Sequence, residues 1–212
     1  MYWMLPRVRE PQDVASSAAQ AFNESIIQTR RVMATAILAD LEVRNDKLGL
    51  FGHSTRVAEI ADKVAQRFNL SPEARLDLTT AARIHEVGMI AVPPNLVDSP
   101  DRLPPETIAR IRSQAFFSAE IARATQNDRT VRLIEEQYTE FRFLKTRFRE
   151  NEEDLLLASI LHVVDAFDAV TFPRPYQQDI PDEIRLDGLL LGQGTLFHPD
   201  VIDQLCALDL AA

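Results

Sequence analysis

Apolar residues recur three and four positions apart along most of the chain, as they do in helices that bury one face. A first long helix is expected from about residue 13 to about residue 45. Its apolar stripe consists of Phe22, Ile26, Met33, Ile37 and Leu41. Alternating runs of Val, Ile and Thr, which are typical of half-buried strands, do not occur. The pattern therefore predicts an all-α chain.

Gly and Pro divide the remainder of the chain into further predicted helices. Ser71 followed by Pro72 is typical of a helix start. The segment 129–151 contains neither Gly nor Pro, and we expect it to form one long or slightly broken helix. All the expected helices after the first cover 53–68, 72–86, 106–125, 129–151 and 154–170, with a short last one from Pro199. Such segments predict a bundle of roughly seven to nine helices.

The composition narrows the class of protein. The 212 residues include 23 Lys and Arg against 32 Asp and Glu, and the formal net charge of -9 argues against binding to DNA or to an anionic membrane. None of the 6 glycines lies between Gly88 and Gly188, so the glycine-rich phosphate loops of common nucleotide enzymes are absent. Cys206 is the single cysteine, and no apolar stretch is long enough to span a bilayer. We expect a soluble, cytoplasmic protein.

The long first helix leaves two interpretations of the N-terminal region open. Its apolar stripe suits packing against the core of the same chain, and it also suits pairing with a second copy in a homodimer. We predict an N-terminal extension with this helix at 1–46 and a folded domain at 47–212.

Five strings in the sequence resemble, in their order and separation, the HD superfamily of metal-dependent phosphohydrolases and, more narrowly, its HD-GYP branch. They are Gly52–Ala58 (GHSTRVA), Ala81–Pro93 (AARIHEVGMIAVP), Leu103–Glu106 (LPPE), Val164–Thr171 (VDAFDAVT) followed by Arg174–Tyr176 (RPY), and Gly192–Pro199 (GQGTLFHP). The resemblance covers roughly residues 35–208. It implies that the bundle has the all-helical HD-domain fold.

The resemblance also implies a metal site and an activity. Families of this kind hold metal through a first histidine, a histidine–aspartate pair and a later aspartate, which correspond here to His53, His85, Glu86 and Asp165. Imidazole nitrogens and carboxylate oxygens suit Fe, Mn, Zn or Mg. The HD-GYP branch hydrolyses the bacterial messenger cyclic di-GMP.

Several positions depart from the pattern of the branch. Glu86 replaces the aspartate of the pair, and Met89 replaces a lysine that normally follows. Gln114 lies at about the position of a further metal-binding histidine, with Ser118 near a glycine. The paired histidines and the Gly-Tyr-Pro loop expected within 132–150 are absent from the sequence. A site for several ions should therefore be lost, whereas a single ion and a vestigial site without metal both stay open.

We therefore expect a degenerate HD-GYP domain with little or no phosphodiesterase activity, which acts in bacterial signalling as a binding or interaction module. The alternative is an active HD phosphohydrolase with one metal ion that acts on a nucleotide or another phosphoester. No residue is singled out as catalytic. The partners under consideration are a signalling protein, a cyclic dinucleotide and a second copy of the chain.

Two further features carry weaker expectations. His162 precedes Asp165 by three residues, so both lie on one helix face, and we expect His162 to support the site or the fold rather than to bind metal. His198 is expected to be structural. A locally basic stretch consists of Arg142, Lys145, Arg147 and Arg149. It suits either a phosphate-rich ligand or an amphipathic helix whose cations face neighbouring glutamates.

Overall fold

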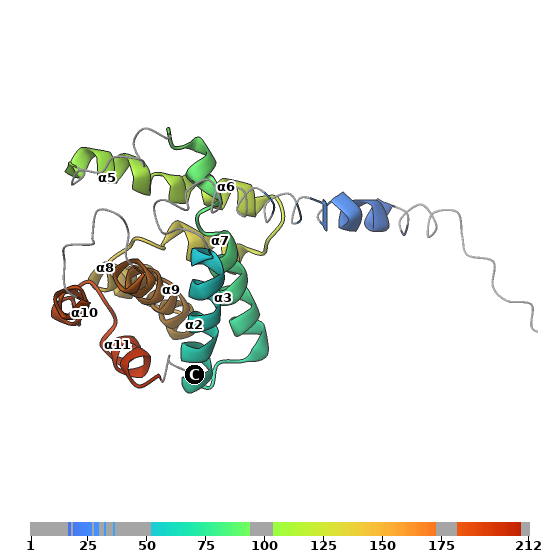
Figure 1. The fold of residues 1–212 in the computed structure, drawn as a ribbon. Coiled ribbons are helices and arrows are strands. Elements are labelled where there is room, and N and C mark those ends of the chain that lie inside the picture. Colours follow the sequence, from blue (N-terminus) through green and yellow to red (C-terminus); the bar gives the residue numbers. More distant parts are fainter. Residues whose placement is uncertain are drawn as a thin grey trace, which may run out of the picture.

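The computed structural model describes residues 52–93, 104–172 and 182–208, together with residues 17, 19–26, 28, 29, 32 and 36 nearer the N-terminus (Figure 1). Within these residues the regular structure is helical, and the β-type contact is an isolated bridge between Gln193 and Phe197. The predicted all-α class is confirmed.

Nine α-helices and one 3-10 helix, η2, lie within residues 52–93, 104–172 and 182–208. In chain order they are α2 (His53–Arg67), α3 (Pro72–Ile84), η2 (Val87–Ala91), α5 (Pro105–Arg112), α6 (Gln114–Arg123), α7 (Asp128–Glu135), α8 (Phe141–Arg147), α9 (Glu152–Thr171), α10 (Asp182–Leu191) and α11 (Pro199–Cys206). Figure 1 shows α9 between α2 and α3 on one side and α10 and α11 on the other. The helices α5 and α6 lie together at one end of this bundle.

Polar side chains begin three of these helices. Ser71, Asn127 and Asn151 each accept a hydrogen bond from the backbone N–H three residues later. The helix start predicted at Ser71 and Pro72 is confirmed by this cap. The caps set where α3, α7 and α9 begin and therefore which of their faces meets the core.

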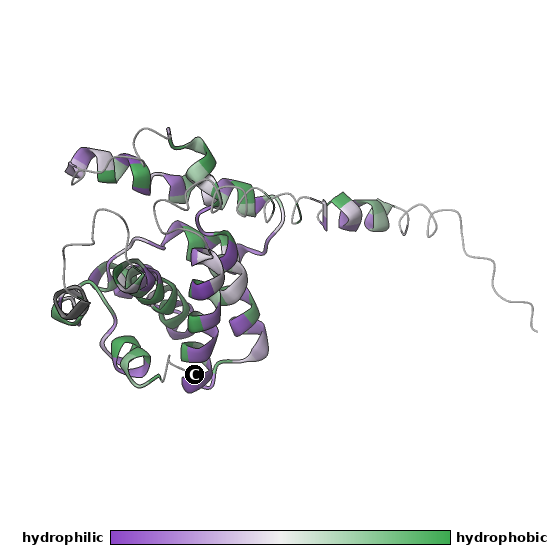
Figure 2. Cartoon of the chain, in the orientation of Figure 1, coloured by the Kyte–Doolittle hydropathy of each residue, from purple (hydrophilic) through white to green (hydrophobic). Residues whose placement is uncertain are grey.

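The most apolar segment of the sequence, α9, contacts six other helices: α2, α3, α7, α8, α10 and α11. Its residues 157–161 and 163–164 are buried, and Figure 2 shows the apolar character of this helix within the bundle. Burying one Leu, Ile or Val side chain contributes about 1.5–3 kcal/mol. This packing fixes the second half of α9, where Asp165 and Asp168 lie, against the N-terminal end of α2.

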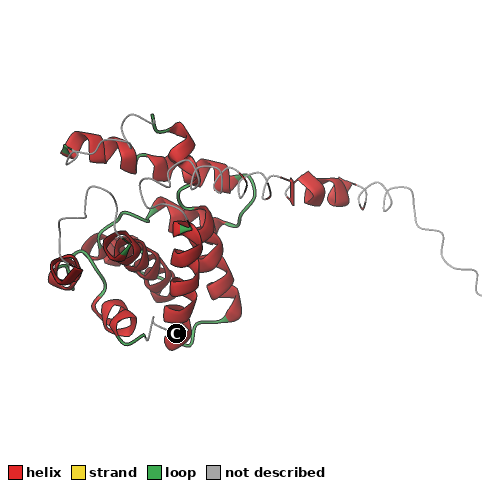
Figure 3. Cartoon of the chain, viewed as in Figure 1, coloured by secondary structure: helices red, strands yellow, loops and turns green. Residues whose placement is uncertain are grey.

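Two predicted helices are divided in the structure (Figure 3). Segment 106–125 forms α5 and α6, which meet at Ser113, whose hydroxyl donates to the carbonyl oxygen of Arg110 at 2.6 Å. Segment 129–151 forms α7 and α8, and the expectation of one long or slightly broken helix is corrected to two helices joined by a turn at 136–140. The backbone N–H groups of Phe141 and Arg142 donate to the carbonyl oxygens of Leu196 and Thr195, so the helical hydrogen-bond pattern is interrupted before α8. The helix α10 was not predicted, because the sequence signal there is interrupted by Gly188.

The structure describes only part of the N-terminal region for which the sequence analysis made predictions. Residues 19–26 are helical, and Phe22 of the predicted stripe is 66% exposed. The remainder of the first helix and the predicted boundary between 1–46 and 47–212 lie outside the described residues. Among the helices that the structure describes, none combines the length and the apolar character needed to cross a bilayer.

Candidate metal centre

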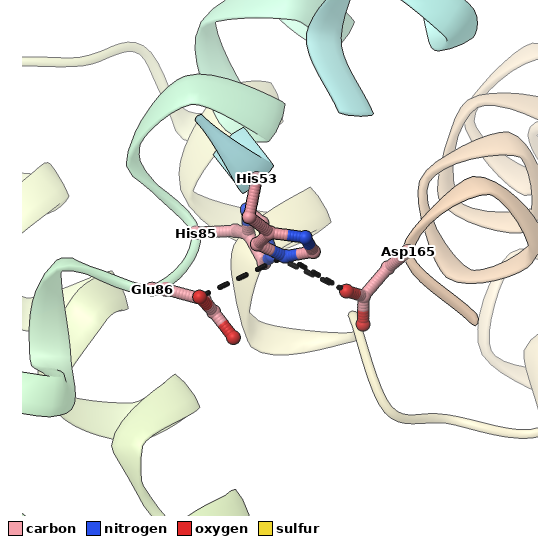
Figure 4. Close-up of side chains that lie close together, drawn as sticks. All are labelled: His53, His85, Glu86 and Asp165. Carbon is pink, nitrogen blue, oxygen red and sulfur yellow. Dashed lines mark hydrogen bonds and ion pairs between the residues drawn. The ribbon is translucent and has the colours of Figure 1, made fainter. Parts of the chain in front are cut away.

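Four side chains from separate elements meet beside the second half of α9. His53 is the first residue of α2, His85 follows the last residue of α3, Glu86 precedes η2, and Asp165 lies on α9. One nitrogen or oxygen from each side chain lies within 4.8 Å of the others, and Figure 4 shows the four side chains close together. The fold thus brings together all four residues that the resemblance named, and we call them the four-residue cluster.

The separations between the donor atoms suit one ion. His53 Nε2 lies 3.3 Å from His85 Nε2 and 3.2 Å from Asp165 Oδ1. It lies 3.7 Å from Glu86 Oε2, and His85 Nε2 lies 3.6 Å from Asp165 Oδ1. An ion bound tetrahedrally at about 2.1 Å from each donor would hold its donors about 3.4 Å apart. These four separations lie on both sides of that value, and all four donor atoms lie within 4.8 Å of one another, so the donor set is compatible with a single ion.

A carboxylate outside the cluster orients the ring of His53. Nδ1 of His53 lies 2.6 Å from Oδ2 of Asp168, and Asp168 accepts two further hydrogen bonds, from Nε and Nη2 of Arg56, at 2.7 and 2.9 Å. An Nδ1–H that donates to a carboxylate leaves the Nε2 lone pair directed at the common point. The sequence analysis assigned no role to Asp168 or Arg56. The available signal was their spacing, since each follows a member of the cluster by three residues, which is one helical turn.

The ring of His85 is held in the same way by the backbone. Its Nδ1 lies 2.7 Å from the carbonyl oxygen of Ala82. Because a carbonyl only accepts, Nδ1 carries the proton and Nε2 is left as a donor of electrons to a ligand or ion. Both histidines are fully buried, so their tautomers are set by the protein rather than by water.

The cluster favours positive charge. Three carboxylates, those of Glu86, Asp165 and Asp168, surround the two imidazoles, and the guanidinium bonded to Asp168 offsets only one of them. Burial by itself lowers the pKa of His53, but the three carboxylates outweigh burial and raise it to about 10. Burial by itself also lowers the pKa of His85, but the neighbouring carboxylates, mainly Asp165, outweigh burial and raise it. Two excess negative charges are thus left to be balanced by protons or by one divalent cation.

Glu86 and Met89, which stand where the family pattern has an aspartate and a lysine, occupy different environments. The side chain of Glu86 is 12% exposed and reaches the cluster from the turn before η2, so the longer carboxylate still contributes an oxygen. Met89 is 8% exposed within η2. A buried thioether supplies no positive charge to a phosphate, in contrast to the lysine expected from the resemblance.

A buried network of amides lies where the resemblance leads one to expect further histidines. Gln114 is fully buried and uses both amide hydrogens, toward Gln137 Oε1 at 3.2 Å and the Tyr138 hydroxyl at 2.9 Å. Its Oε1 accepts from the hydroxyl of Ser118 at 2.7 Å. The hydrogen-bonding groups of Gln114 are therefore committed to protein partners.

Gln137 connects this network to the cluster. Its Nε2 donates to the backbone oxygen of His85 at 3.0 Å and to that of Ile134 at 2.9 Å, while its Oε1 accepts from Gln114. The side chain is fully buried. Removing one member of such a buried network is costly, because its partner is left buried and unpaired. The network holds the backbone of His85 and offers no imidazole to an ion.

The segment that follows Glu86 packs closely on α6. The backbone N–H of Gly88 donates to the Ser118 hydroxyl at 2.8 Å. A Cβ added at Gly88 would lie 2.2 Å from the backbone oxygen of Gln114 and 2.6 Å from the backbone nitrogen of Ser118. Only glycine fits this approach, which holds η2 and Glu86 in place.

The other two histidines lie outside the four-residue cluster. Nδ1 of His162 is 2.7 Å from the carbonyl oxygen of Thr139, and its ring packs edge-on against Phe197. The ring of His198 lies 4.5 Å from that of Phe141, centroid to centroid. These contacts tie together neighbouring parts of the bundle.

The basic stretch consists largely of paired side chains. Arg142 is paired with Glu140, Arg147 with Glu136, and Arg149 with Glu150. Lys145 lies 4.9 Å from the centroid of the Phe141 ring. Of the two interpretations of the stretch, these contacts favour the amphipathic helix whose cations face glutamates.

A helical bundle that gathers two histidines and two carboxylates around one point has the architecture of an HD-type metal-binding domain. The chain belongs to the HD domain family: the family model matches residues 37–201. This family is metal-dependent, and the candidate site lies within the matched residues.

Relatives of this chain include cyclic dinucleotide phosphodiesterases. The cyclic di-GMP phosphodiesterase response regulator RpfG of Xanthomonas campestris pv. campestris is 28% identical over 155 residues, which are 71% of this chain and 41% of that protein. The 3'3'-cGAMP-specific phosphodiesterase 3 of Vibrio cholerae is 26% identical over 133 residues, which are 61% of this chain and 29% of that protein. The chain thus spans less than half the length of these relatives, and the resemblance to HD-GYP phosphodiesterases is confirmed.

A solved structure shares the fold. Bd1817, a HDG"Y"P protein from Bdellovibrio bacteriovorus, superposes with a TM-score of 0.56 at 18% sequence identity. The match covers 72% of this chain and 50% of that one. The predicted HD-domain bundle is confirmed by this similarity.

Proposed function

We propose that this chain is a degenerate HD-GYP domain that binds a single divalent metal ion, has little or no cyclic dinucleotide phosphodiesterase activity, and acts as a binding module in bacterial signalling. The observation that carries the proposal is the amide network of Gln114 and Gln137, whose hydrogen-bonding groups are used by protein partners. The relatives' names supply the class of ligand, a cyclic dinucleotide. A signalling protein remains the second partner considered.

His53, His85, Glu86 and Asp165 would hold the ion. Two imidazole nitrogens and two carboxylate oxygens form a donor set that suits Fe, Mn or Zn. The same donor set suits Mg less well, because Mg prefers oxygen ligands. When bound, such an ion supplies positive charge and a Lewis acid for a phosphoryl oxygen. Asp168 keeps the Nε2 atom of His53 directed at the ion.

Charge and donor number both limit the site to one ion. The cluster carries two excess negative charges when its imidazoles are neutral, which one divalent ion balances. Among the described residues no second group of three or more His, Cys, Asp or Glu side chains converges in this way. A second adjacent ion would have to be held by carboxamides and would be left without compensating charge.

An active HD phosphohydrolase with one ion is the second candidate function. It is favoured by the exposure of the two carboxylates, since the side chains of Glu86 and Asp165 are 12% and 14% exposed while both histidines are buried. Solvent therefore reaches the carboxylate side of the cluster. A phosphoester approaching from there would meet the ion directly.

A hydrolysis assay tests the proposal and separates the two candidates. The full chain, loaded with Mn²⁺ or Fe²⁺, is incubated with cyclic di-GMP, 3'3'-cGAMP and a panel of other phosphoesters, and the products are separated by chromatography. We expect both cyclic dinucleotides to remain intact. Hydrolysis that is abolished by His85→Ala and retained by His198→Ala, a histidine outside the cluster, would contradict the proposal. Turnover restricted to another phosphoester would instead establish the second candidate.

A further inference from the structure

An open pocket of about 370 Å³ lies at the end of α8. Arg132 of α7 lines one side of the pocket, and residues 146–151 line the rest. Asn151 is the residue before α9, and the rise of about 1.5 Å per residue puts Asp165 about 20 Å further along that helix. A ligand in this pocket would therefore not touch the four-residue cluster.

Arg132 is held in a fixed orientation at the pocket. Its Nη2 donates to the carbonyl oxygen of Arg147 at 2.7 Å, and its guanidinium carbon lies 4.2 Å from the centroid of the Phe148 ring. That ring is only 2% exposed, so it gives the guanidinium a rigid surface to stack on. None of the contacts of Arg132 within the described residues is with a carboxylate. Its remaining N–H groups are therefore available to an anion.

The other two arginines of the pocket keep donors that their acidic partners do not use. Arg147 donates to Glu136 through Nη1 alone, at 2.6 and 2.7 Å, and its side chain is 54% exposed. Arg149 pairs with Glu150 at 3.2 Å, and these two side chains are 75% and 84% exposed. An ion pair so exposed is weak in water, so an anion can take the place of Glu150 beside Arg149.

The charge and the arrangement of these side chains indicate the class of ligand. Three arginines and one glutamate line the pocket, and Glu136 behind Arg147 offsets one further positive charge. A positive excess remains at this place in a chain of formal net charge -9. A carboxylate offers two oxygens in one plane and suits one guanidinium, whereas a phosphoryl group offers three oxygens in different directions. A phosphoryl group can therefore accept from arginines of separate elements, and the exposed Thr146 hydroxyl adds a further donor.

We propose that this pocket binds a small phosphorylated molecule through its phosphoryl group, with Arg132 as the fixed donor and Arg149 as the donor that exchanges Glu150 for the ligand. The volume suits such a ligand, since small-molecule sites measure about 300–1,000 Å³. The pocket gives Arg147 and Arg149 a role beyond pairing with glutamates. Because the pocket is separate from the proposed metal centre, this binding function needs no ion there.

The experiment titrates the full chain with inorganic phosphate, the simplest carrier of the phosphoryl group, and follows the backbone N–H signals by ¹⁵N NMR. Signals of residues 146–151 report on the pocket, and those of His53 and His85 report on the metal centre. We expect saturable shifts within 146–151 in the wild type. We expect succinate, a dicarboxylate, to shift these signals much less at the same concentrations.

Substitutions identify the donors. We expect phosphate affinity to fall about tenfold or more in Arg132→Gln and in Arg149→Gln, because each loses a charge-assisted hydrogen bond. Arg149→Gln keeps the test decisive if Arg132→Gln disturbs the fold, since the Arg149 side chain is largely exposed. Arg142→Gln is the matched control with unchanged affinity, because Arg142 lies on α8, is 56% exposed and does not line the pocket.

Three results would overturn the inference. The first is the absence of saturable shifts within 146–151 in the wild type. The second is wild-type affinity in Arg149→Gln together with a folded Arg132→Gln, or an equal loss in Arg142→Gln, which would show a general effect of charge. The third is succinate binding as tight as that of phosphate. A chain that binds phosphate here and no metal at His85 would refute the proposed single-ion centre and leave this inference standing.

Discussion

Asp168 contributes to the proposed metal centre without offering it a donor atom. Its carboxylate bonds to Nδ1 of His53 and is itself held by two hydrogen bonds from Arg56. The guanidinium of Arg56 also lies 4.0 Å from the centroid of the Phe172 ring, so the group that holds the carboxylate is itself packed against an aromatic ring. The position of the His53 ring therefore depends on a residue next to the cluster.

We predict that Asp168→Asn lowers the affinity of the chain for Mn²⁺ or Zn²⁺ by about 10–100-fold, because the neutral amide no longer fixes the tautomer of His53. A competition titration with a chromogenic chelator measures the affinity. Asp62→Asn is the matched control, since Asp62 accepts the same pair of hydrogen bonds from Arg75 but lies outside the cluster. Equal affinities of the two variants would refute the role of Asp168.

The raised pKa of His53 makes the stability of the metal-free chain depend on pH. The pKa is about 10 in the folded chain and 6.5 for an unperturbed histidine, so the folded state binds the proton more tightly. Its contribution to stability is complete below pH 6.5 and is lost as the pH rises toward 10. We predict that the free energy of unfolding falls more steeply across this window in the wild type than in His53→Gln.

Urea denaturation of chelator-treated protein at a series of pH values measures this slope. His198→Gln is the control, because the pKa of His198 is lowered by burial and its titration falls below the window. This control should keep the slope of the wild type. Parallel slopes for the wild type and His53→Gln would show that His53 is not the group responsible.

At the scale of elements, the centre depends on the close contact between η2 and α6. Glu86 and η2 are positioned by the approach of Gly88 to the backbone of α6, and α6 also carries the buried amide of Gln114. Because the two elements touch through backbone atoms, there is no flexible side chain that can move aside. Any added atom must displace the segment that carries Glu86.

We predict that Gly88→Ala destabilises the chain by about 1–3 kcal/mol or more, because its Cβ would lie 2.2 Å from a backbone oxygen of α6. Gly188→Ala in α10 is the matched control, since nothing lies within 4 Å of the Cβ there. This control should raise the free energy of unfolding by about 0.5–1 kcal/mol, as alanine favours a helix over glycine. Urea denaturation compares the two, and a neutral Gly88→Ala would contradict the close packing.

The helix boundaries also show which parts of the fold could be predicted from the sequence pattern. Helix α9 and the start of α3 could be predicted, because a long apolar run and a Ser-Pro cap are local signals. The division of 129–151 at residues 136–140 could not be, because the backbone N–H groups of Phe141 and Arg142 find their acceptors on Leu196 and Thr195, which are distant in the chain. Those partners are defined only by the tertiary structure.

For the molecule as a whole, the four-residue cluster was predicted from motif resemblance and the surrounding groups were not. The strings around His53, His85 and Asp165 are weak signals one by one, but their order and separation along the chain identified the residues that the fold brings together. The bonds from Asp168 and from the amide network join segments that are distant in the chain, and the one local signal was the position of Asp168 one helical turn after Asp165. Homodimerisation through the N-terminal helix stays a prediction.

The central claim, one divalent ion per chain, is tested most directly by metal analysis. The full chain is purified without chelator, and its metal content is determined by mass spectrometry together with that of His85→Ala and His198→Ala. We predict close to one equivalent of transition metal in the wild type and in His198→Ala, and nearly none in His85→Ala. Two equivalents in the wild type, or none, would contradict the account.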